Sequence, residues 1–469
     1  MKIFFINPPA KEKISREGRC MIKGSAWTAV FPPFSLVSSA AVLRKENFDV
    51  KVLDCIAKNI DIYSLEEEIK QFNPDVVILN TTTPSIKEDL KVVELIKKNN
   101  LKTKVAVIGI HPSSLPDETF SLSKKLDHII RGEPEFTIRD LILRLRNNQP
   151  LSKVKGISYR SDGKIFHNPP RRFIQDLDSL PFPAWDLIDV SDYRVPFTDN
   201  SFLMIVPSRG CPYKCAFCTS RSYYGENQRL RSPENIVDEI AEGKNRFQVI
   251  DFIFWTESFT ANRNFVVEVA DEILKRKLKV RWMCNSRVNN VDLELFKKIK
   301  RAGCWMVSFG VESGCQKILN LSKKGITLEQ SVNAIKLARK AGLQTSAQFI
   351  IGLPGETEET ALKTLSFAKK LDADYTQFYC AVPFPGSELY EIAKKKDWIK
   401  DYNWQNFNQA QSVLDIGTIK ATQVMSLKRK FYLKYYLRIK PILRELRKLR
   451  SLSELKSFFR AAKDFLSWV

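Results

Sequence analysis

The sequence predicts an α/β fold in which a Rossmann-like parallel sheet is followed by a partial, TIM-like (β/α)6 barrel and a basic helical tail. Two series of short apolar segments, each separated by amphipathic stretches, predict the two sheets. The length of 469 residues points the same way, because it exceeds what one hydrophobic core ordinarily organises. Two or three domains are therefore expected.

The first series occupies residues 1–145 and predicts the N-terminal domain. Helical stretches such as Leu65–Phe72 and Ile86–Asn99 lie between its strands. Strand, helix and strand at this spacing form an open, doubly wound sheet. The strands are expected at Lys2–Asn7, Asp49–Asp54, Asp75–Asn80, Lys104–Gly109 and His128–Arg131.

The loops that follow these strands are candidate binding sites, because ligands on such sheets bind beyond the carboxyl ends of the strands. A plain turn is the alternative for Gly and Pro at these places. The residues singled out in these loops are Pro8, Thr82, Ser85, Gly109, His111, Gly132 and Glu133.

Residues 146–195 interrupt the alternation and predict a linker. The segment from Val154 to Tyr159, with Gly163 and Phe166, has the pattern of a small hairpin. A Pro-rich stretch that includes Pro181 and Pro183 follows it, and such a stretch forms a tether with little helix.

The second series covers residues 196–395 and predicts six βα units, which make a partial barrel with its chemistry at the C-terminal mouth. Helices are expected between the strands, for example at Ser232–Asn245, Phe265–Lys275 and Ser331–Ala341. The strands are expected near Leu203–Pro207, Val249–Trp255, Val280–Asn285, Met306–Val311, Gln344–Ile351 and Tyr375–Val382.

The C-terminal region, residues 396–469, is expected to be helical and basic. From Ala421 to Val469 the chain has 13 Lys or Arg against 3 Asp or Glu, which is nearly half of the net charge of +22. Between Lys428 and Arg438 cations alternate with aromatic residues, and Phe458, Phe465 and Trp468 add apolar side chains farther on. Such helices bind an anionic membrane surface or nucleic acid. The alternative is a solvated helix face.

The whole chain lacks the features of membrane-spanning and disulfide-rich proteins. No run of about 18 apolar residues is present, which disfavours a transmembrane helix. The first residues have the pattern of a strand rather than of a signal peptide. Nine cysteines without paired spacing fit a reducing compartment. We therefore expect a cytoplasmic protein, peripheral at the membrane if the tail binds lipid.

The strongest motif is Cys211-Pro-Tyr-Lys-Cys215-Ala-Phe-Cys218, a Cys-x3-Cys-x2-Cys pattern directly after the first expected barrel strand. Three thiolates on a short loop can hold three irons of a [4Fe–4S] cluster and leave the fourth iron open. Structural zinc takes four protein ligands, and no fourth Cys or His lies nearby. Gly210 permits a sharp turn, and Phe217 is placed to shield the cluster.

At these residues the chain resembles the radical SAM superfamily, over residues 203 to about 395. The resemblance implies that the open iron binds S-adenosylmethionine (SAM) and that the reduced cluster cleaves it to a 5′-deoxyadenosyl radical. It also implies a low-potential electron donor of the flavodoxin or ferredoxin type. An iron–sulfur electron carrier is the non-enzyme alternative, but a carrier would need all four irons ligated.

Further segments resemble the SAM-binding segments of this family. Thr256 and Glu257 stand where the family branch commonly has two Asp residues. The resemblance implies that Glu312 and Ser313 meet the SAM ribose and that Lys324 pairs with its carboxylate. Taken singly, a buried charge pair would explain Glu312, and ordinary surface would explain Lys324. The expected SAM contacts are Phe217, Thr256, Glu257, Ser286, Arg287, Glu312, Ser313, Lys324 and Gly352.

The N-terminal domain resembles the cobalamin-binding domains of B12-dependent radical SAM proteins. The resemblance rests on the segments from Val107 to Pro116 and from Asp127 to Glu135, and it implies that the seven loop residues named above surround cobalamin. The Asp-x-His-x-x-Gly loop of other corrinoid proteins is absent, so a cobalt without a His ligand is implied. A degenerate domain without cobalamin is the alternative.

The resemblance implies a choice of reactions. The family most often methylates an unactivated carbon, and a minority performs oxidative cyclisation. The chain resembles the branch of the anaerobic magnesium-protoporphyrin monomethyl ester cyclases and hopanoid methylases. The basic amphipathic tail favours an apolar substrate, a lipid or a tetrapyrrole-like molecule. A tRNA-modifying enzyme is the alternative, although no RNA-binding module is recognisable.

Overall fold

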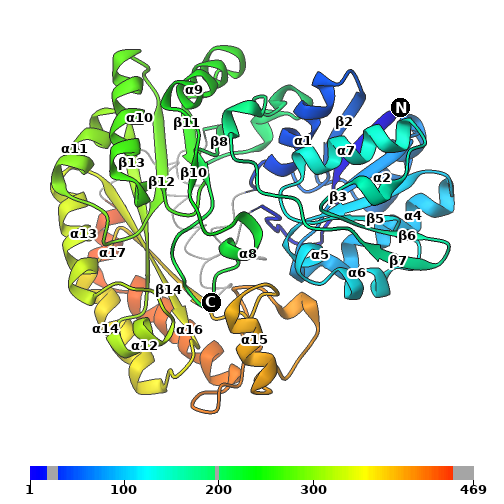
Figure 1. The fold of residues 1–469 in the computed structure, drawn as a ribbon. Helices are drawn as coiled ribbons and strands as arrows, with labels where there is room; N and C mark the ends of the chain where they lie inside the picture. Colours follow the sequence, from blue (N-terminus) through cyan, green and yellow to red (C-terminus); the bar gives the residue numbers. More distant parts are fainter. Residues whose placement is uncertain (18–29, 196–199, 447–469) are drawn as a thin grey trace.

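The computed structural model describes residues 1–17, 30–195 and 200–446. The two expected parallel sheets are present, with the N-terminal sheet beside the partial barrel (Figure 1). The fold class is therefore confirmed. Cys20 and the apolar tail residues Phe458, Phe465 and Trp468 lie outside the described residues.

The N-terminal sheet has the strand order β2-β1-β3-β4-β5-β6-β7. Its first five strands are parallel. Their inward runs of Val, Ile and Leu are fully buried, as expected where helices cover both faces of a sheet. The parallel strands are β1 (Lys2–Asn7), β2 (Asp49–Asp54), β3 (Val76–Asn80), β4 (Lys104–Ile108) and β5 (His128–Ile130).

Seven helices connect and flank these strands. β2 lies on one side of β1, and β3, β4 and β5 follow on the other side. Because the crossovers are right-handed, α1 lies on one face of the sheet and α2 and α4 lie on the other. Asp61 begins α2 by accepting a hydrogen bond from the Ser64 amide. The helices are α1 (Phe34–Lys45), α2 (Ile62–Phe72), α3 (Ile86–Asp89), α4 (Lys91–Asn99), α5 (Ile110–Ser114), α6 (Pro116–Leu122) and α7 (Glu135–Arg146).

The hairpin expected in the linker extends the N-terminal sheet. Its strands are β6 (Ile157–Ser161) and β7 (Lys164–His167), and β6 pairs antiparallel with β5. The unpaired edge of β5 explains the addition, because an open edge offers free backbone groups to a neighbouring strand. The parts of the linker before and after the hairpin run as irregular connections, interrupted by short 3₁₀ turns.

The barrel sheet has the order β8-β11-β12-β13-β14-β15, and all its pairings are parallel. Its two edge strands, β8 and β15, do not pair with each other, so the barrel is partial as expected. The strands are β8 (Phe202–Ile205), β11 (Asp251–Phe254), β12 (Arg281–Ser286), β13 (Cys304–Glu312), β14 (Gln344–Ile351) and β15 (Tyr375–Cys380).

Helices cover the outer face of this sheet (Figure 1). Each long helix is amphipathic and turns its apolar face to the strands, for example Phe265 and Val269 in α10. These helices are α9 (Pro233–Phe247), α10 (Arg263–Lys275), α11 (Leu293–Arg301), α12 (Gln316–Leu321), α13 (Leu328–Lys340) and α14 (Glu358–Leu371). The next helix, α15 (Glu388–Lys395), lies at the cysteine loop, where the amide of Leu389 donates to the carbonyl of Ala216 at 2.8 Å.

The C-terminal region closes the barrel and returns to the N-terminal domain. It contains η7 (Trp404–Asn406), α16 (Ala421–Tyr436) and α17 (Ile439–Leu446). The indole of Trp404 donates to Glu118 of the N-terminal domain at 2.5 Å. This contact joins the C-terminal region to the N-terminal domain.

The aromatic residues of α16 are buried, which corrects the expectation of an exposed membrane-binding face between Lys428 and Arg438. Phe431, Tyr432 and Tyr435 pack around Phe378 of β15. The hydroxyl of Tyr432 accepts the backbone amide of Phe378 at 3.1 Å. No helix within residues 1–17, 30–195 and 200–446 is long and apolar enough to cross a bilayer.

Candidate functional site

The cysteine loop is held by backbone contacts at the carboxyl end of β8. Gly210 has a φ of +90°, and a Cβ there would lie 2.2 Å from the carbonyl oxygen of Asn227. The amide of Cys211 donates to the carbonyl of Gly225 at 3.1 Å. Within the loop, the amide of Cys218 donates to the carbonyl of Cys215 at 3.1 Å. The turn that the sequence predicted at Gly210 is therefore present.

The three cysteines of this loop form no disulfide bond within the described residues. Cys211 is buried, and Cys215 and Cys218 are half-buried. No three His, Cys, Asp or Glu side chains of the described chain are close enough to hold a single metal ion. Three thiolates on one short loop are the donor set of a [4Fe–4S] cluster with one open iron, so the residues present fit that cofactor.

A cavity of about 300 Å³ opens beside this loop, at the mouth of the barrel. Ser15 and Phe31 reach it from the N-terminal domain, and Gln409 and Tyr436 reach it from the C-terminal region. The structure brings seven predicted site residues to its wall: Phe217, Cys218, Glu257, Ser286, Arg287, Glu312 and Lys324.

The cavity contains a buried ion pair between Glu312 and Lys324, whose atoms Oε1 and Nζ are 2.7 Å apart. Glu312 has a φ of +67°, at an irregularity in the pairing of β13 with β14. Gly310 makes room for the pair, since a Cβ there would lie 2.5 Å from the Glu312 carboxylate. A left-handed backbone at a non-Gly residue is strained, and such strain persists only where the surrounding contacts hold it in place.

Arg287 connects the cavity to the cysteine loop. Its guanidinium lies 3.7 Å from the ring centre of Tyr213 and donates to the backbone carbonyl of Lys324. It also donates to the sulfur of Cys215 at 3.6 Å. Hydrogen bonds to cluster sulfurs tune a reduction potential, so Arg287 is placed to act on a bound cluster.

Three of the expected SAM contacts lie away from the cavity wall. Thr256 bonds to Ser208, with its hydroxyl 2.6 Å from the serine hydroxyl. Ser313 is buried and bonds to Thr364 at 3.2 Å. A Cβ at Gly352 would lie 3.2 Å from the side chain of Val424.

Sequence reasoning missed a group of neutral polar residues inside the barrel. They lie on alternate positions of β12, β13, β14 and β15, so the two-residue period of inward-facing strand positions could have found them. Gln348 donates to Ser308 at 3.2 Å, and Tyr379 donates to Gln377 at 2.6 Å. The missed residues are Asn285, Ser308, Ser346, Gln348, Tyr375, Gln377 and Tyr379.

Glu356, after β14, was also missed, and burial raises its pKa to about 7. The folded chain keeps this proton at pH values where the unfolded chain, with an ordinary value of 4.5, has lost it. Stability therefore falls as the pH rises from about 4.5 to about 7. The Glu356→Gln variant should show less of this loss, by up to about 3 kcal/mol, in urea unfolding at pH 5 and pH 8.

The exposed neighbour Glu358 supplies the control, because its replacement by Gln removes an equal charge at the surface. That variant should keep the pH dependence of the wild-type chain. An equal change in both variants would show that burial of Glu356 has no effect of its own.

The loops after β3 and β4 contain buried polar atoms that lack partners in the described part of the chain. These atoms are the hydroxyls of Thr82 and Thr83 and both ring nitrogens of His111. Burial lowers the pKa of His111 to about 3, so its ring is neutral, and it packs edge-on against Trp404 at 4.9 Å. Buried polar groups without partners are costly, and a polar ligand at this edge would satisfy them.

The other predicted residues of this edge have protein partners. The carbonyl of Pro8 accepts from Arg16 at 3.0 Å, and the hydroxyl of Ser85 donates to Asp89 at 2.6 Å. Arg16 and Asp89 themselves form a fully buried ion pair of 2.5 Å, which the sequence did not reveal. This pair lies at the switch point between β1 and β3.

Gly132 and Glu133 also bond within the protein. The amide of Gly132 donates to the hydroxyl of Ser113 at 3.0 Å. The carboxylate of Glu133 is bound by Arg209 and Arg229 of the barrel and is buried. Glu133 was expected beside cobalamin; its carboxylate is bound by these two arginines, and its contact with cobalamin stays a prediction.

Two domain profiles match the chain: the Radical SAM superfamily over residues 205–368 and the B12 binding domain over residues 27–142. An uncharacterized methyltransferase of Pyrococcus horikoshii is 33% identical over 449 residues, which are 95% of both chains. The anaerobic magnesium-protoporphyrin IX monomethyl ester cyclase of Rubrivivax gelatinosus is 29% identical, over 92% of this chain and 78% of the cyclase.

Solved structures show the same arrangement of domains. The cobalamin-dependent SAM radical enzyme OxsB, with aqua-cobalamin and SAM bound, superposes with a TM-score of 0.76 at 19% identity, over 98% of this chain and 70% of that chain. The radical SAM methyltransferase TsrM of Kitasatospora setae, with cobalamin and a [4Fe–4S] cluster, gives 0.69 at 19% identity, over 92% and 85%.

Proposed function

The chain belongs to the radical SAM superfamily and carries a B12 binding domain, and on this premise we propose that it is a cobalamin-dependent methyltransferase acting on an unactivated carbon. The observation that supports the proposal is the cavity at the barrel mouth. Cys218, the Glu312–Lys324 pair and side chains of the N-terminal domain all line this one space. A cluster, SAM and a substrate could therefore meet there.

The residues around the cavity would have separate roles in the proposed reaction. Cys211, Cys215 and Cys218 would each bind one iron, and Arg287 would donate to the sulfur of Cys215. The cofactors of this family supply the one-electron cleavage of SAM and the transfer of a methyl group. Phe217 and the aromatic wall of the cavity exclude water from a reactive radical.

Cobalamin would be held at the carboxyl edge of the N-terminal sheet. The unsatisfied hydroxyls of Thr82 and Thr83 and the ring of His111 supply polar groups there. Gly109, with a φ of +129°, keeps the adjoining backbone close to β3. The neutral ring of His111 can donate or accept a hydrogen bond at the rim of the cofactor.

The lining of the cavity supports an apolar substrate with neutral polar groups, a lipid or a tetrapyrrole-like molecule. Apart from Glu257, Arg287 and the Glu312–Lys324 pair, its lining residues are apolar, aromatic or neutral amides and hydroxyls. Relatives include a bacteriochlorophyllide d C-12(1)-methyltransferase of Chlorobaculum tepidum, which is 24% identical to this chain. Oxidative cyclisation without methyl transfer is the second candidate, favoured by the likeness to the Rubrivivax cyclase.

Anaerobic reconstitution tests the proposal. The chain is loaded with iron, sulfide and hydroxocobalamin, and iron and corrin are then quantified. About four irons and one corrin per chain are expected. Four irons without corrin would leave the radical SAM core intact and overturn the cobalamin-dependent reaction. Release of a methylated product from a tetrapyrrole or lipid would separate methyl transfer from cyclisation.

Lys324→Ala should weaken SAM binding by about tenfold or more, because a hydrogen bond to a charged group contributes about 1.5–3 kcal/mol. The variant should retain its full iron content, since Lys324 holds no iron. Equilibrium binding of SAM to the reconstituted protein measures the effect. Lys323 is the matched control, since its amine pairs with Glu388 at the surface. Equal affinities in the two variants would exclude Lys324 from the SAM site.

We also propose that a flavodoxin or ferredoxin is the electron donor.

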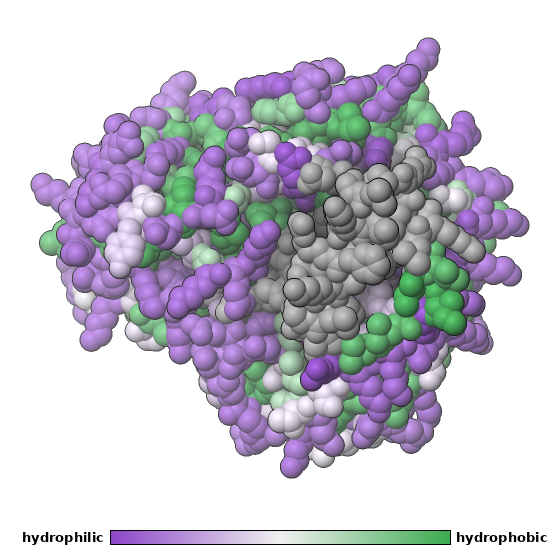
Figure 2. Space-filling view, turned by 180° about the vertical axis from the view of Figure 1, so that it is seen from behind, coloured by the Kyte–Doolittle hydropathy of each residue, from purple (hydrophilic) through white to green (hydrophobic). Residues whose placement is uncertain are grey.

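We further propose that α17 makes a peripheral contact with the membrane. Hydrophilic side chains dominate the face shown in Figure 2, whereas Ile439 and Leu443 of α17 are exposed apolar residues one helical turn apart. Replacing both with Ser should reduce cosedimentation with anionic liposomes. Tyr63→Ser, at an exposed aromatic of α2, is the control. Unchanged cosedimentation would remove the membrane proposal.

A further inference from the structure

Two short antiparallel strands frame the cysteine loop. They are β9 (Ser208–Arg209) and β10 (Arg229–Leu230), and they pair Arg209 with Arg229. Arg209 is only two residues before Cys211, so any shift of its backbone would move the first expected iron ligand. The position of the cysteine loop therefore depends on the position of this pair of strands.

Both arginine side chains leave the barrel and enter the N-terminal domain. Arg209 donates to Glu135 at 2.5 Å and 3.1 Å and to Glu133 at 3.2 Å. Arg229 donates to both carboxylate oxygens of Glu133 at 2.9 Å. The side chains of all four residues are at most 6% exposed. The domain interface thus contains two cations and two anions in mutual contact.

The charges are balanced only when the two domains are together. Burial alone would raise the pKa of Glu135, yet the neighbouring guanidinium of Arg209 holds that pKa below its ordinary value. If the domains separated, the four charged side chains would lose their partners and would have to be solvated by water. Breaking a buried pair by removing one partner is strongly destabilising, because it leaves an uncompensated charge.

The two carboxylates belong to the candidate cobalamin edge. Glu133 follows β5, and Glu135 begins α7. The intervening loop is bonded through Gly132 to Ser113 of α5, the helix that contains His111. A continuous chain of contacts therefore links the cysteine loop to the loops expected around cobalamin.

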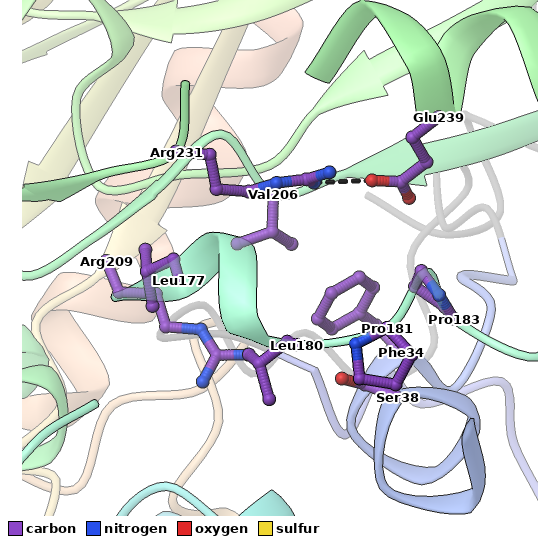
Figure 3. A pocket seen from close by; sticks show the side chains of 10 residues that line it. All are labelled: Phe34, Ser38, Leu177, Leu180, Pro181, Pro183, Val206, Arg209, Arg231 and Glu239. Carbon is purple, nitrogen blue, oxygen red and sulfur yellow. Dashed lines mark hydrogen bonds and ion pairs between the residues drawn. The ribbon is translucent and has the colours of Figure 1, made fainter. Parts of the chain in front are cut away.

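Figure 3 shows a small cavity at this junction, lined by residues of both domains. Arg209 and Ser38 line a cavity of about 20 Å³, which has room for little more than one water molecule. Ser38 of α1 donates to Glu135 at 3.2 Å. The Arg231–Glu239 pair lines the same small cavity and lies entirely within the barrel. It offers an internal control for the interface pair.

We propose that Arg209 is a positioning residue through which Glu133 and Glu135 of the N-terminal domain hold the cysteine loop and set the electrostatic potential at its cluster. The inference rests on the proposed function in one respect, that the loop of Cys211 binds a [4Fe–4S] cluster. Arg209 itself touches no cofactor in this account.

The midpoint potential of the reconstituted cluster tests the proposal. Glu135→Gln removes an anion near the cluster and should raise the potential, since the reduced cluster carries more negative charge. Arg209→Gln removes a cation and should lower it. The double variant should return toward the wild-type value. A loop that was merely loosened would shift both single variants in one direction, and that result would overturn the proposal.

Glu239→Gln is the matched control, because it removes a buried carboxylate from Arg231, whose hydrogen-bond partners Asn235 and Glu239 both belong to α9 of the barrel. Its shift should be smaller than that of Glu135→Gln, and equal shifts would overturn the proposal. If either single variant takes up no cluster, the iron content of the double variant tests the proposal. Restored iron content would support a role of charge balance, and iron content that stays low would overturn the proposal. A wild-type chain that takes up no cluster overturns the proposed function, and this inference with it.

Discussion

Variants with Ala at Cys211, Cys215 or Cys218 should take up no stable [4Fe–4S] cluster and produce no 5′-deoxyadenosine from SAM. Each thiolate is expected to bind one iron, because the three cysteines stand within eight residues of one loop. A cluster that loses one of three protein ligands has two open irons and falls apart. Iron content, visible absorbance and product analysis after anaerobic reconstitution measure the loss.

Cys315→Ala is the control for this series. Cys315 is half-buried like two of the loop cysteines but precedes α12, outside the cysteine loop. That variant should keep the iron content and SAM cleavage of the wild-type chain. Cleavage of SAM by any of the three loop variants at the wild-type rate would show that the cluster lies elsewhere.

Gly109→Ala should cost roughly 3 kcal/mol or more of unfolding free energy and weaken cobalamin binding at least tenfold, from backbone strain and overpacking combined. Gly109 has a φ of +129° and a ψ of 175°, a conformation essentially reserved for Gly. A Cβ there would lie 2.1 Å from the carbonyl oxygen of Thr81. The loops of β3 and β4 must therefore separate. Urea unfolding and titration with hydroxocobalamin measure the two effects.

Gly163→Ala separates this clash from simple backbone strain. Gly163 also has a positive φ, of +74°, but a Cβ there would meet nothing within 4 Å. Its replacement should cost about 1–2 kcal/mol, the penalty of a left-handed residue alone, and leave cobalamin binding unchanged. Equal cobalamin affinities of the Gly109 and Gly163 variants would show that the β3–β4 edge does not hold the cofactor.

Local patterns predicted most of the secondary structure. β1 and β2 begin and end where the alternation of apolar residues placed them, and β4 ends one residue earlier, at Ile108. That last residue, Gly109, has a backbone conformation incompatible with a strand. The cysteine loop could also be predicted, because a single turn brings together three expected ligands that stand within eight residues.

Residues far apart in the sequence were less predictable. Lys324 was predicted to pair with the carboxylate of SAM, but its contact with Glu312 depends on an irregularity in the pairing of β13. Glu133 was assigned to cobalamin from its position after a strand, and only the packed domains reveal Arg209 and Arg229 beside it. The aromatics of α16 were expected at a surface, since nothing local shows that β15 lacks a covering helix.

The sequence by itself determined the two-sheet architecture, the three-cysteine motif of the cysteine loop and the family. Each of these depends on hydrophobic period or on spacing within a few residues, which chain connectivity alone enforces. The tertiary structure decided which charges pair and which faces are buried. Those outcomes depend on contacts such as Arg209 with Glu135, separated by 74 residues, whose free energy exists only once both domains have excluded water from between them.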